Sequence, residues 1–434
     1  MMQPLKILQA TPYDAFHCIG ADCEDTCCDG WGITVDRITY GKYQKCSDPE
    51  LGPSLRDLVV INTESSGEDD CAMIKLSETH CPFLADGLCS VQKKLGEEYL
   101  SNTCSVYPRI MNGVGDVLER TLDLSCPEAA RVVLLGSGPL EFAEVDGAAE
   151  GFRIGNLSVP DTPNPSYDGK TYTHFQTVRS LAVHVLQQRA YPLWQRLVIL
   201  GHLSDKLTEM ANQAGEAAVP DVISAYHQAI QDHTFDDLLR KCQAKPEVQL
   251  ITILELIVSR ITSDFTGRRF LECYQEFMQG LEWTQESNLK DIGILYSEAY
   301  TSYYASFIAQ HEDLMERYLI NYVYKNLFPL GRLESNQKAG IHHAENSISV
   351  QCMLMMAHYA IIRTLLIGMA GLHKSNFAID HAIKGIQSTT KAFQHSTSFP
   401  ARALDILTRG GMKNGASMGV LIQDPMPADP ASNA

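Results

Sequence analysis

The sequence predicts a mostly α protein, in which an irregular cysteine-rich cluster-binding module precedes an all-helical domain. Ten of the 13 cysteines lie within the first 126 of 434 residues. From about residue 173 onward, apolar residues recur every three or four positions, as on one face of an α-helix. We therefore expect an iron–sulfur or other metal-binding module over 1–150, a linker over 151–172, a helical domain over 173–421 and a disordered tail over 422–434.

Short elements are expected within the cysteine-rich module. Residues 18–31 mix Gly, Asp and Cys without a helical or alternating period, which indicates irregular backbone around a ligand. Asn112-Gly113 is a typical hairpin turn sequence. The remaining expectations are a strand at 33–36, helices at 39–46, 50–61 and 91–99, a hairpin at 81–89, and a strand or short helix at 117–124.

Amphipathic helices are expected throughout the second half. Their apolar stripes lie at 178–186, 194–203, 250–261 and 314–325. The stretch 353–372 is apolar enough to resemble a membrane span, but His358 and Arg363 lie in its middle. Because a charge at mid-bilayer is costly, we interpret this stretch as a buried core helix and expect no membrane association.

Charge narrows the class of partner. The net charge is −17, which argues against nucleic-acid binding, since that requires a basic surface. Residues 1–130 carry 10 Lys and Arg against 21 Asp and Glu. Such an acidic module suits a cationic, lysine-bearing protein partner, although the charge could equally serve solubility.

Cysteine chemistry depends on the compartment. The first ten residues hold no long apolar run of the kind a secretory signal needs. We therefore expect a cytoplasmic protein, whose thiols stay reduced and available to metals rather than forming disulfides.

Eight cysteines are the candidate metal ligands. The first group has four, three and no intervening residues, and the second is spaced more widely, unlike the paired ligands of a structural zinc site. Iron–sulfur clusters use all-thiolate ligation at irregular spacing, so a cluster is favoured over zinc. Eight thiols exceed the four that one cluster needs, which leaves open two sites or additional unligated thiols. The candidates are Cys18, Cys23, Cys27, Cys28, Cys81, Cys89, Cys104 and Cys126, whereas Cys46, Cys71 and the three later cysteines are interpreted as ordinary residues.

Three stretches resemble the flagellin lysine N-methylase family. The first runs from Tyr13 to Trp31, the second from Cys81 to Arg109, and the third reads YLINYVYKNLFP over 318–329. The second includes Cys81-Pro82-Phe83-Leu84, Leu88-Cys89, Thr103-Cys104 and Tyr107-Pro108-Arg109. The cysteine module alone also resembles small zinc- or iron-chelating proteins.

The resemblance implies transfer of methyl groups from S-adenosylmethionine to lysine side chains of flagellin, and a 4Fe-4S cluster. The sequence lacks the Gly-x-Gly loop of an ordinary methyltransferase and the Cys-x3-Cys-x2-Cys triplet of radical enzymes. Arg109 and Tyr107 are the expected cofactor-binding residues, with Arg109 pairing with a carboxylate. Candidates for the base that deprotonates lysine are Tyr107, Tyr99, Glu97 and Asp29. The alternative function is a metal-chelating or metal-delivery protein without catalysis.

Overall fold

Two units make up the computed structural model. One comprises residues 1–132 and 141–161, and the other comprises residues 133–140 and 162–434. The structure describes residues 6–28, 32–63, 67–77, 80–115, 117–145, 166–167, 170–171, 174–214, 216–240, 242–263, 266–284, 286–331 and 347–425. The predicted linker and tail therefore lie largely outside the described residues.

The first unit contains a four-stranded sheet that the sequence did not predict. Its order is β7-β8-β1-β9, where β1 (Lys6–Ala10) pairs in parallel with β8 (Val117–Leu122) and antiparallel with β9 (Phe142–Val145). β7 (Arg109–Val114) forms a hairpin with β8, and Asn112 pairs with Glu119 inside it. The predicted turn at Asn112-Gly113 is therefore wrong, because those residues continue the strand and the chain turns after them, at Gly115 (φ +60°).

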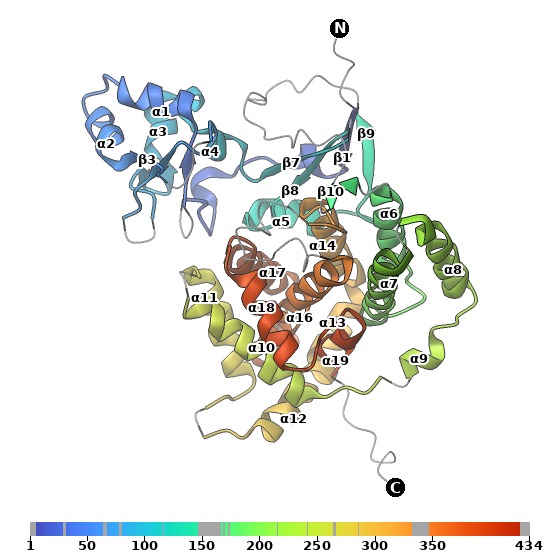
Figure 1. The fold of residues 1–434 in the computed structure, drawn as a ribbon. Helices are drawn as coiled ribbons and strands as arrows, with labels where there is room; N and C mark the ends of the chain where they lie inside the picture. Colours follow the sequence, from blue (N-terminus) through green and yellow to red (C-terminus); the bar gives the residue numbers. More distant parts are fainter. Residues whose placement is uncertain are drawn as a thin grey trace. The chain divides into compact units, whose positions relative to one another are not determined.

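The cysteine-rich part of this unit is built from short elements (Figure 1). The predicted strand at 33–36, the hairpin at 81–89 and the strand at 117–124 are confirmed, whereas the predicted helix 91–99 stops where Gly96 adopts φ +88°. A three-stranded sheet has the order β2-β4-β3. The elements are β2 (Thr34–Val35), α1 (Arg37–Gln44), α2 (Leu51–Leu58), β3 (Val59–Ile61), β4 (Ala72–Ile74), β5 (Leu84–Ala85), β6 (Leu88–Cys89), α3 (Ser90–Leu95), η3 (Glu97–Tyr99) and α4 (Asn102–Val106).

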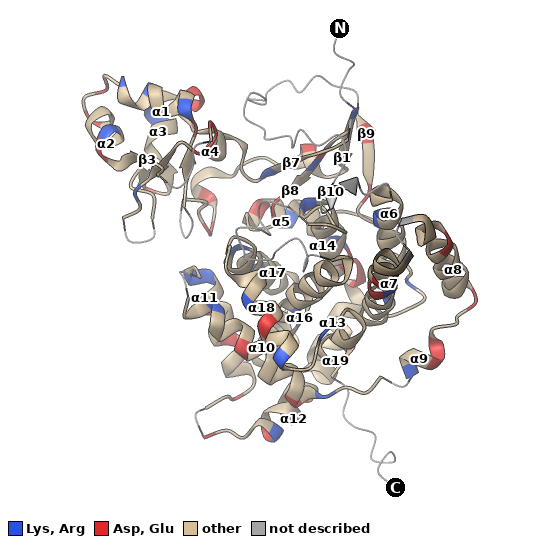
Figure 2. Cartoon of the chain, viewed as in Figure 1, with Lys and Arg blue, Asp and Glu red and all other residues tan. Residues whose placement is uncertain are grey.

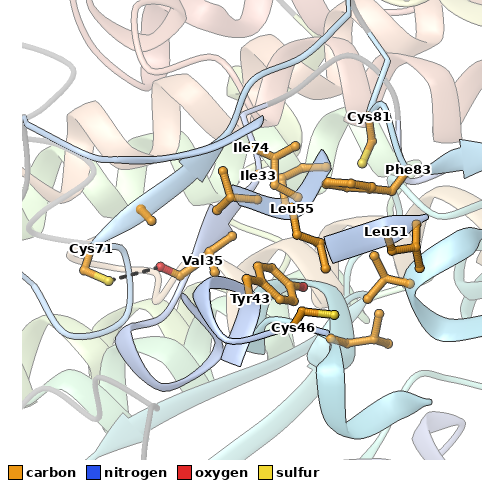
Figure 3. Close-up of a cluster of buried hydrophobic side chains, with 14 residues drawn as sticks. Ile33, Val35, Tyr43, Cys46, Leu51, Leu55, Cys71, Ile74, Cys81 and Phe83 are labelled. Carbon is orange, nitrogen blue, oxygen red and sulfur yellow. Dashed lines mark hydrogen bonds between the residues drawn. The ribbon is translucent and has the colours of Figure 1, made fainter. Parts of the chain in front are cut away.

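An apolar core holds these short elements together (Figure 3). Figure 3 shows Ile33, Leu55 and Phe83 in one cluster with the thiols of Cys46, Cys71 and Cys81. Cys46 is 6% exposed and Cys71 is 5% exposed, and the Cys71 thiol donates to the carbonyl of Val35 over 3.6 Å. These two cysteines are packing residues of the core.

Helices dominate the second unit, so the mostly α prediction is confirmed, and each predicted stripe lies on a helix. Charged residues lie on its outer helices, including α9, α11 and α12 (Figure 2). The elements are β10 (Ser166–Tyr167), β11 (Lys170–Thr171), α6 (Phe175–Leu186), α7 (Leu193–Ala214), η5 (Glu216–Ala218), α8 (Val219–Gln231), α9 (Asp236–Arg240), α10 (Pro246–Ile261), α11 (Arg268–Gly280), α12 (Leu289–Ala299), η6 (Tyr300–Tyr304), α13 (Ala305–Gln310), α14 (Glu312–Lys325), α16 (Ile348–His373), η7 (Lys374–Asn376), α17 (Ile379–Gln394), α18 (Phe399–Arg409), η8 (Ala416–Met418) and α19 (Gly419–Ile422).

The central helix of this unit is α16. It is long and apolar enough to cross a membrane, yet its most apolar stretch lies entirely inside the fold. α7, α11, α12 and α17 pack around it. The interpretation of 353–372 as a buried core helix is therefore confirmed.

Candidate metal and cofactor site

The first cysteine loop has irregular backbone. Cys18 and Cys23 flank the 3₁₀ turn η2 (Gly20–Asp22), whose Gly20 has φ +59° and so needs the freedom of glycine. The Cys23 thiol donates to the Asp25 carbonyl over 3.4 Å. This loop is described as far as Cys28, and Asp29, Gly30 and Trp31 lie outside the described residues.

An ion pair anchors this loop to α5 (Pro127–Leu134). Arg131 on α5 binds Glu24 of the loop, and also Glu128 over 2.7 Å. The Cys126 carbonyl accepts from the amide of Ala130 at 2.9 Å and so starts the same helix. The ion pair therefore holds the loop beside Cys126.

A backbone hydrogen bond joins the first loop to the second group of cysteines. The amide of Cys81 donates to the Cys28 carbonyl at 2.8 Å. Cys89 directly precedes α3, and the amide of Cys104 on α4 donates to the Ser101 hydroxyl at 3.2 Å. Backbone hydrogen bonds and helix starts thus position the backbone at Cys81, Cys89 and Cys104.

Cys28 lies at the centre of the thiols. Hydrogen bonds with its thiol are the main reason why the pKa values of Cys27 and Cys81 are raised far above the usual range. Burial raises the pKa of Cys104 to about 12, and the neighbouring Cys28 and Cys89 add to the shift. Burial also raises the pKa of Cys89, again with a contribution from Cys28.

The other thiols form a second group. Burial raises the pKa of Cys126 to about 12, and Cys23 and Cys18 contribute further. Burial also raises the pKa of Cys23, with Cys18 among its neighbours, and Cys126 acts on Cys27. Electrostatic interactions thus link Cys28 with Cys27, Cys81, Cys89 and Cys104, which we call the central group, and link Cys126 with Cys18 and Cys23, which we call the outer group.

The donor set fits a thiophilic metal or cluster in its chemistry. Thiols with raised pKa values are protonated at neutral pH, so a bound metal would displace their protons. Among the residues that the structure describes, however, no group of three or more His, Cys, Asp or Glu side chains is arranged to hold a metal ion. Ligation by these residues consequently stays a prediction.

The two predicted cofactor-binding residues have different surroundings: Tyr107 is near the thiols, whereas Arg109 contacts the ring of Phe16. Burial raises the pKa of Tyr107 well above its usual value, with Asp123, Cys126 and Cys27 adding to the shift. Its hydroxyl is 2.9 Å from the Ser125 hydroxyl. The Arg109 guanidinium lies 5.0 Å from the centre of the Phe16 ring, a cation–π contact.

Tyr13 is a candidate cofactor-binding residue that the sequence analysis did not identify. It is 4% exposed, and among the described residues its hydroxyl has no hydrogen-bond partner. Burial raises its pKa to about 12, which the nearby Arg120 and Arg109 partly oppose. Its position at the start of the 13–31 stretch, which resembles the methylase family, could have identified it.

The other candidate bases are less enclosed. Glu97 is exposed on η3, and Tyr99 is half-buried with the Lys42 ammonium 5.9 Å from its ring centre. Asp29 lies outside the described residues. Tyr107 is the candidate whose electrostatic neighbours include the thiols of Cys126 and Cys27, and Tyr99 packs against the core that Cys28, Cys89 and Cys104 also border.

The chain therefore belongs to the class of proteins that join a cysteine-rich module to a large helical domain. A family model described as the FliB lysine N-methylase C-terminal domain matches residues 179–421, more than half of the chain. This chain belongs to that family. No solved structure matches it.

Curated relatives match a shorter stretch. The lysine-N-methylase of Salmonella typhimurium strain LT2 is 31% identical over 134 residues, which is 31% of this chain and 33% of the relative. The flagellar biosynthetic protein FliU of Salmonella muenchen is 31% identical over 134 residues, 79% of its own length. The match thus spans about a third of the curated lysine-N-methylase.

Proposed function

We propose that this protein is a lysine N-methyltransferase that uses S-adenosylmethionine to methylate flagellin in the cytoplasm. The family match over residues 179–421 carries this proposal, and the lysine-N-methylase name of a relative gives the reaction. The flagellar name of the second relative supports flagellin as the substrate. The acidic composition of residues 1–130 suits a lysine-bearing protein surface.

The proposal includes a 4Fe-4S cluster held by the central group of thiols. The central group offers five thiols, enough for the four thiolates that one cluster takes. A cluster held by three of these thiolates would supply an iron to which the amino and carboxylate groups of the methyl donor could bind.

The protein's own residues would bind and shield the cofactor. Arg109 carries a positive charge that can pair with a carboxylate. The Tyr13 hydroxyl, which has no hydrogen-bond partner among the described residues, lies within the electrostatic influence of Arg109. Buried Tyr107 is protonated at neutral pH and can donate a hydrogen bond next to the thiols. The lysine amine must be neutral when it attacks, because an ammonium group has no lone pair.

The test combines two measurements on the full chain. Protein purified without oxygen should contain iron and sulfide in roughly equal amounts, about four of each per chain. Incubation with flagellin and S-adenosylmethionine should then add methyl-sized mass increments to lysine-containing peptides. Unmodified flagellin in the presence of iron-loaded protein would contradict the proposed activity, and zinc without sulfide would contradict the cluster.

A further inference from the structure

Two histidines are in contact where α16 ends and α17 begins. His373 is the last residue of α16, and His381 lies in the first turn of α17. Their ring centres are 4.0 Å apart, and the ring planes are tilted by 35°. The turn η7 and buried Phe377 connect the two helices, and the Phe377 ring stacks on His381 at 5.7 Å. We call His373 and His381 the histidine pair.

Each ring of the pair has a hydrogen bond that fixes its tautomer. His373 Nε2 lies 3.0 Å from Glu276 Oε2 of α11, and because a carboxylate only accepts, this nitrogen carries a hydrogen. His381 Nδ1 accepts from the Ala378 amide at 3.1 Å, so this nitrogen carries none. A proton added to His373 therefore leaves its bond to Glu276 in place, whereas a proton added to His381 Nδ1 removes the bond from Ala378.

Glu276 remains charged beside the pair. Burial by itself raises the pKa of Glu276, but hydrogen bonds from His373 and Lys384 outweigh it and hold that pKa below its usual value. The Lys384 ammonium lies 2.9 Å from Glu276 Oε1. An ionised carboxylate thus favours the positive charge on the ring that it contacts, which is His373.

The helix ends favour the same division. The C-terminal end of a helix attracts a cation, and the N-terminal end repels one. His373 lies at the first kind of end and His381 at the second. Burial and the neighbouring His373 lower the pKa of His381, which Glu276, the Ala378 backbone and Asp380 oppose. The Ala378 carbonyl, to which a protonated ring could turn, already accepts from the amides of His381 and Ala382 at 3.0 and 3.3 Å.

We propose that the histidine pair is a proton-sensitive switch, which keeps the first turn of α17 closed with one proton and opens it with two. Two imidazolium rings in contact repel each other. The second proton falls on His381, where it removes the bond from the Ala378 amide and places a positive charge at the start of a helix. In the open turn the two rings separate and the proton is taken up without these costs.

The groups around the pair confine the opening to this corner. Lys384, one turn further along α17, is held by Glu276 and by Glu272 at 3.2 Å, so the next turn stays attached to α11. The titratable and charged groups on the surrounding elements are Arg268, Glu272, Cys273 and Glu276 of α11, Lys374 of η7, Asp380 and Lys384 of α17, and Tyr304 and His311, whose rings contact the Phe307 ring beside Phe377.

The test is hydrogen exchange of the full chain at several pH values between about 7.5 and 5, expressed as protection factors. An unfolded histidine titrates near 6.5, and His381 in the closed turn takes its proton only at lower pH. The open turn therefore binds more protons, and protection of residues 378–383 should fall by up to about tenfold for each pH unit below 6.5. A peptide from the middle of α16 is the internal reference, because global unfolding would lower its protection as well.

Two variants separate the titration from a merely structural role. His381→Gln keeps a side-chain acceptor for the Ala378 amide, as glutamine does at this position of a capping box, but cannot take up a proton. Its protection should equal that of the wild type at pH 7.5 and stay constant in acid. His373→Gln can still donate to Glu276 but removes the like charge, so the fall should be smaller than in the wild type.

His233→Gln is the control, because His233 is 60% exposed and lies on another part of the helical unit. It should retain the wild-type fall in protection. Three results would overturn the switch: constant protection of residues 378–383 in the wild type, a wild-type fall in His381→Gln, or a wild-type fall in His373→Gln. The last would show that contact between the two rings does not affect the opening.

Discussion

The amide of Cys81 donates a hydrogen bond to the carbonyl of Cys28 over 2.8 Å, joining residues 53 positions apart in the chain. The two thiols also hydrogen-bond with each other, which places Cys28 at the centre of the cysteine module. Because Cys28 interacts with every other thiol of the central group, it is the residue whose loss should affect metal binding most.

Replacement of Cys28 should abolish metal loading. We expect Cys28→Ala to contain less than one iron per chain, against about four in the wild type, when both are purified without oxygen. Cys242→Ala removes a thiol of the second unit and should keep its full iron content. An unchanged iron content in Cys28→Ala would exclude the central thiol group as the binding site.

The Arg131–Glu24 ion pair should keep the first cysteine loop in place without itself contacting a metal. Arg131→Gln removes the contact that holds the first cysteine loop to α5, so the outer thiols should become more accessible. Thiol-modification rates of the metal-free protein are the measurement, and we expect faster modification of Cys23. Arg240→Gln, at an exposed pair on α9, is the control and should change nothing. Equal rates in the two variants would contradict the anchoring role.

A buried ion pair should contribute strongly to the stability of the helical unit. Glu316 is 0% exposed and binds Arg196 at 2.8 Å and Arg189 at 3.0 Å. Glu316→Ala leaves the buried Arg196 charge without this partner, which should cost about 3–5 kcal/mol of unfolding free energy. Glu209→Ala breaks an exposed pair with Lys206 and should cost less than about 1 kcal/mol. Denaturant unfolding compares the two, and equal losses would show that the buried pair is not coupled to folding.

The contact between α11 and α16 should not tolerate an added methyl group. A Cβ on Gly280 would overlap the backbone carbonyl oxygen of Gly368, which cannot move aside as a side chain can. Gly280→Ala should therefore destabilise the unit by about 1–3 kcal/mol. Gly293→Ala on α12 meets only the Glu247 carboxylate at 3.3 Å and should be near neutral. Thermal unfolding distinguishes them, and similar midpoints would contradict the close packing.

Stability should fall in acid partly through His358. Burial, together with the positive charge of Lys325, lowers its pKa to about 3, whereas an unfolded histidine titrates near 6.5. Between these values the unfolded chain binds the extra proton, so His358 contributes a loss of up to about 1.4 kcal/mol for each pH unit below 6.5.

His358→Phe should remove that contribution and flatten the dependence of unfolding free energy on pH between about 6 and 4. A phenyl ring can occupy the same place between Tyr322 and Phe399, whose ring centres lie 5.5 and 5.4 Å from the histidine ring. His233→Phe, at an exposed position, should leave the profile unchanged. Parallel profiles for the wild type and His358→Phe would contradict the prediction.

Local pattern alone determined most of the helical unit. The apolar stripes at 178–186, 250–261 and 314–325 became α6, α10 and α14, because a period of 3.6 residues can be buried only on a helix. Arg363 and His358 correctly marked α16 as a core helix. Burial of Arg363 is tolerated because its guanidinium donates to the carbonyls of Ile422 and Gln423. Burial of His358 is tolerated because its lowered pKa keeps it neutral.

Only the tertiary structure decided the rest. The sequence indicated eight candidate cysteines but not which of them interact, because a hydrogen bond such as that from Cys81 to Cys28 depends on how distant segments of the chain pack together. The parallel pairing of β1 with β8 was hidden for the same reason. The ion pair between Arg363 and Asp424 beside buried Tyr304 is a further case, since these residues are far apart in the sequence and meet only after the helices have packed.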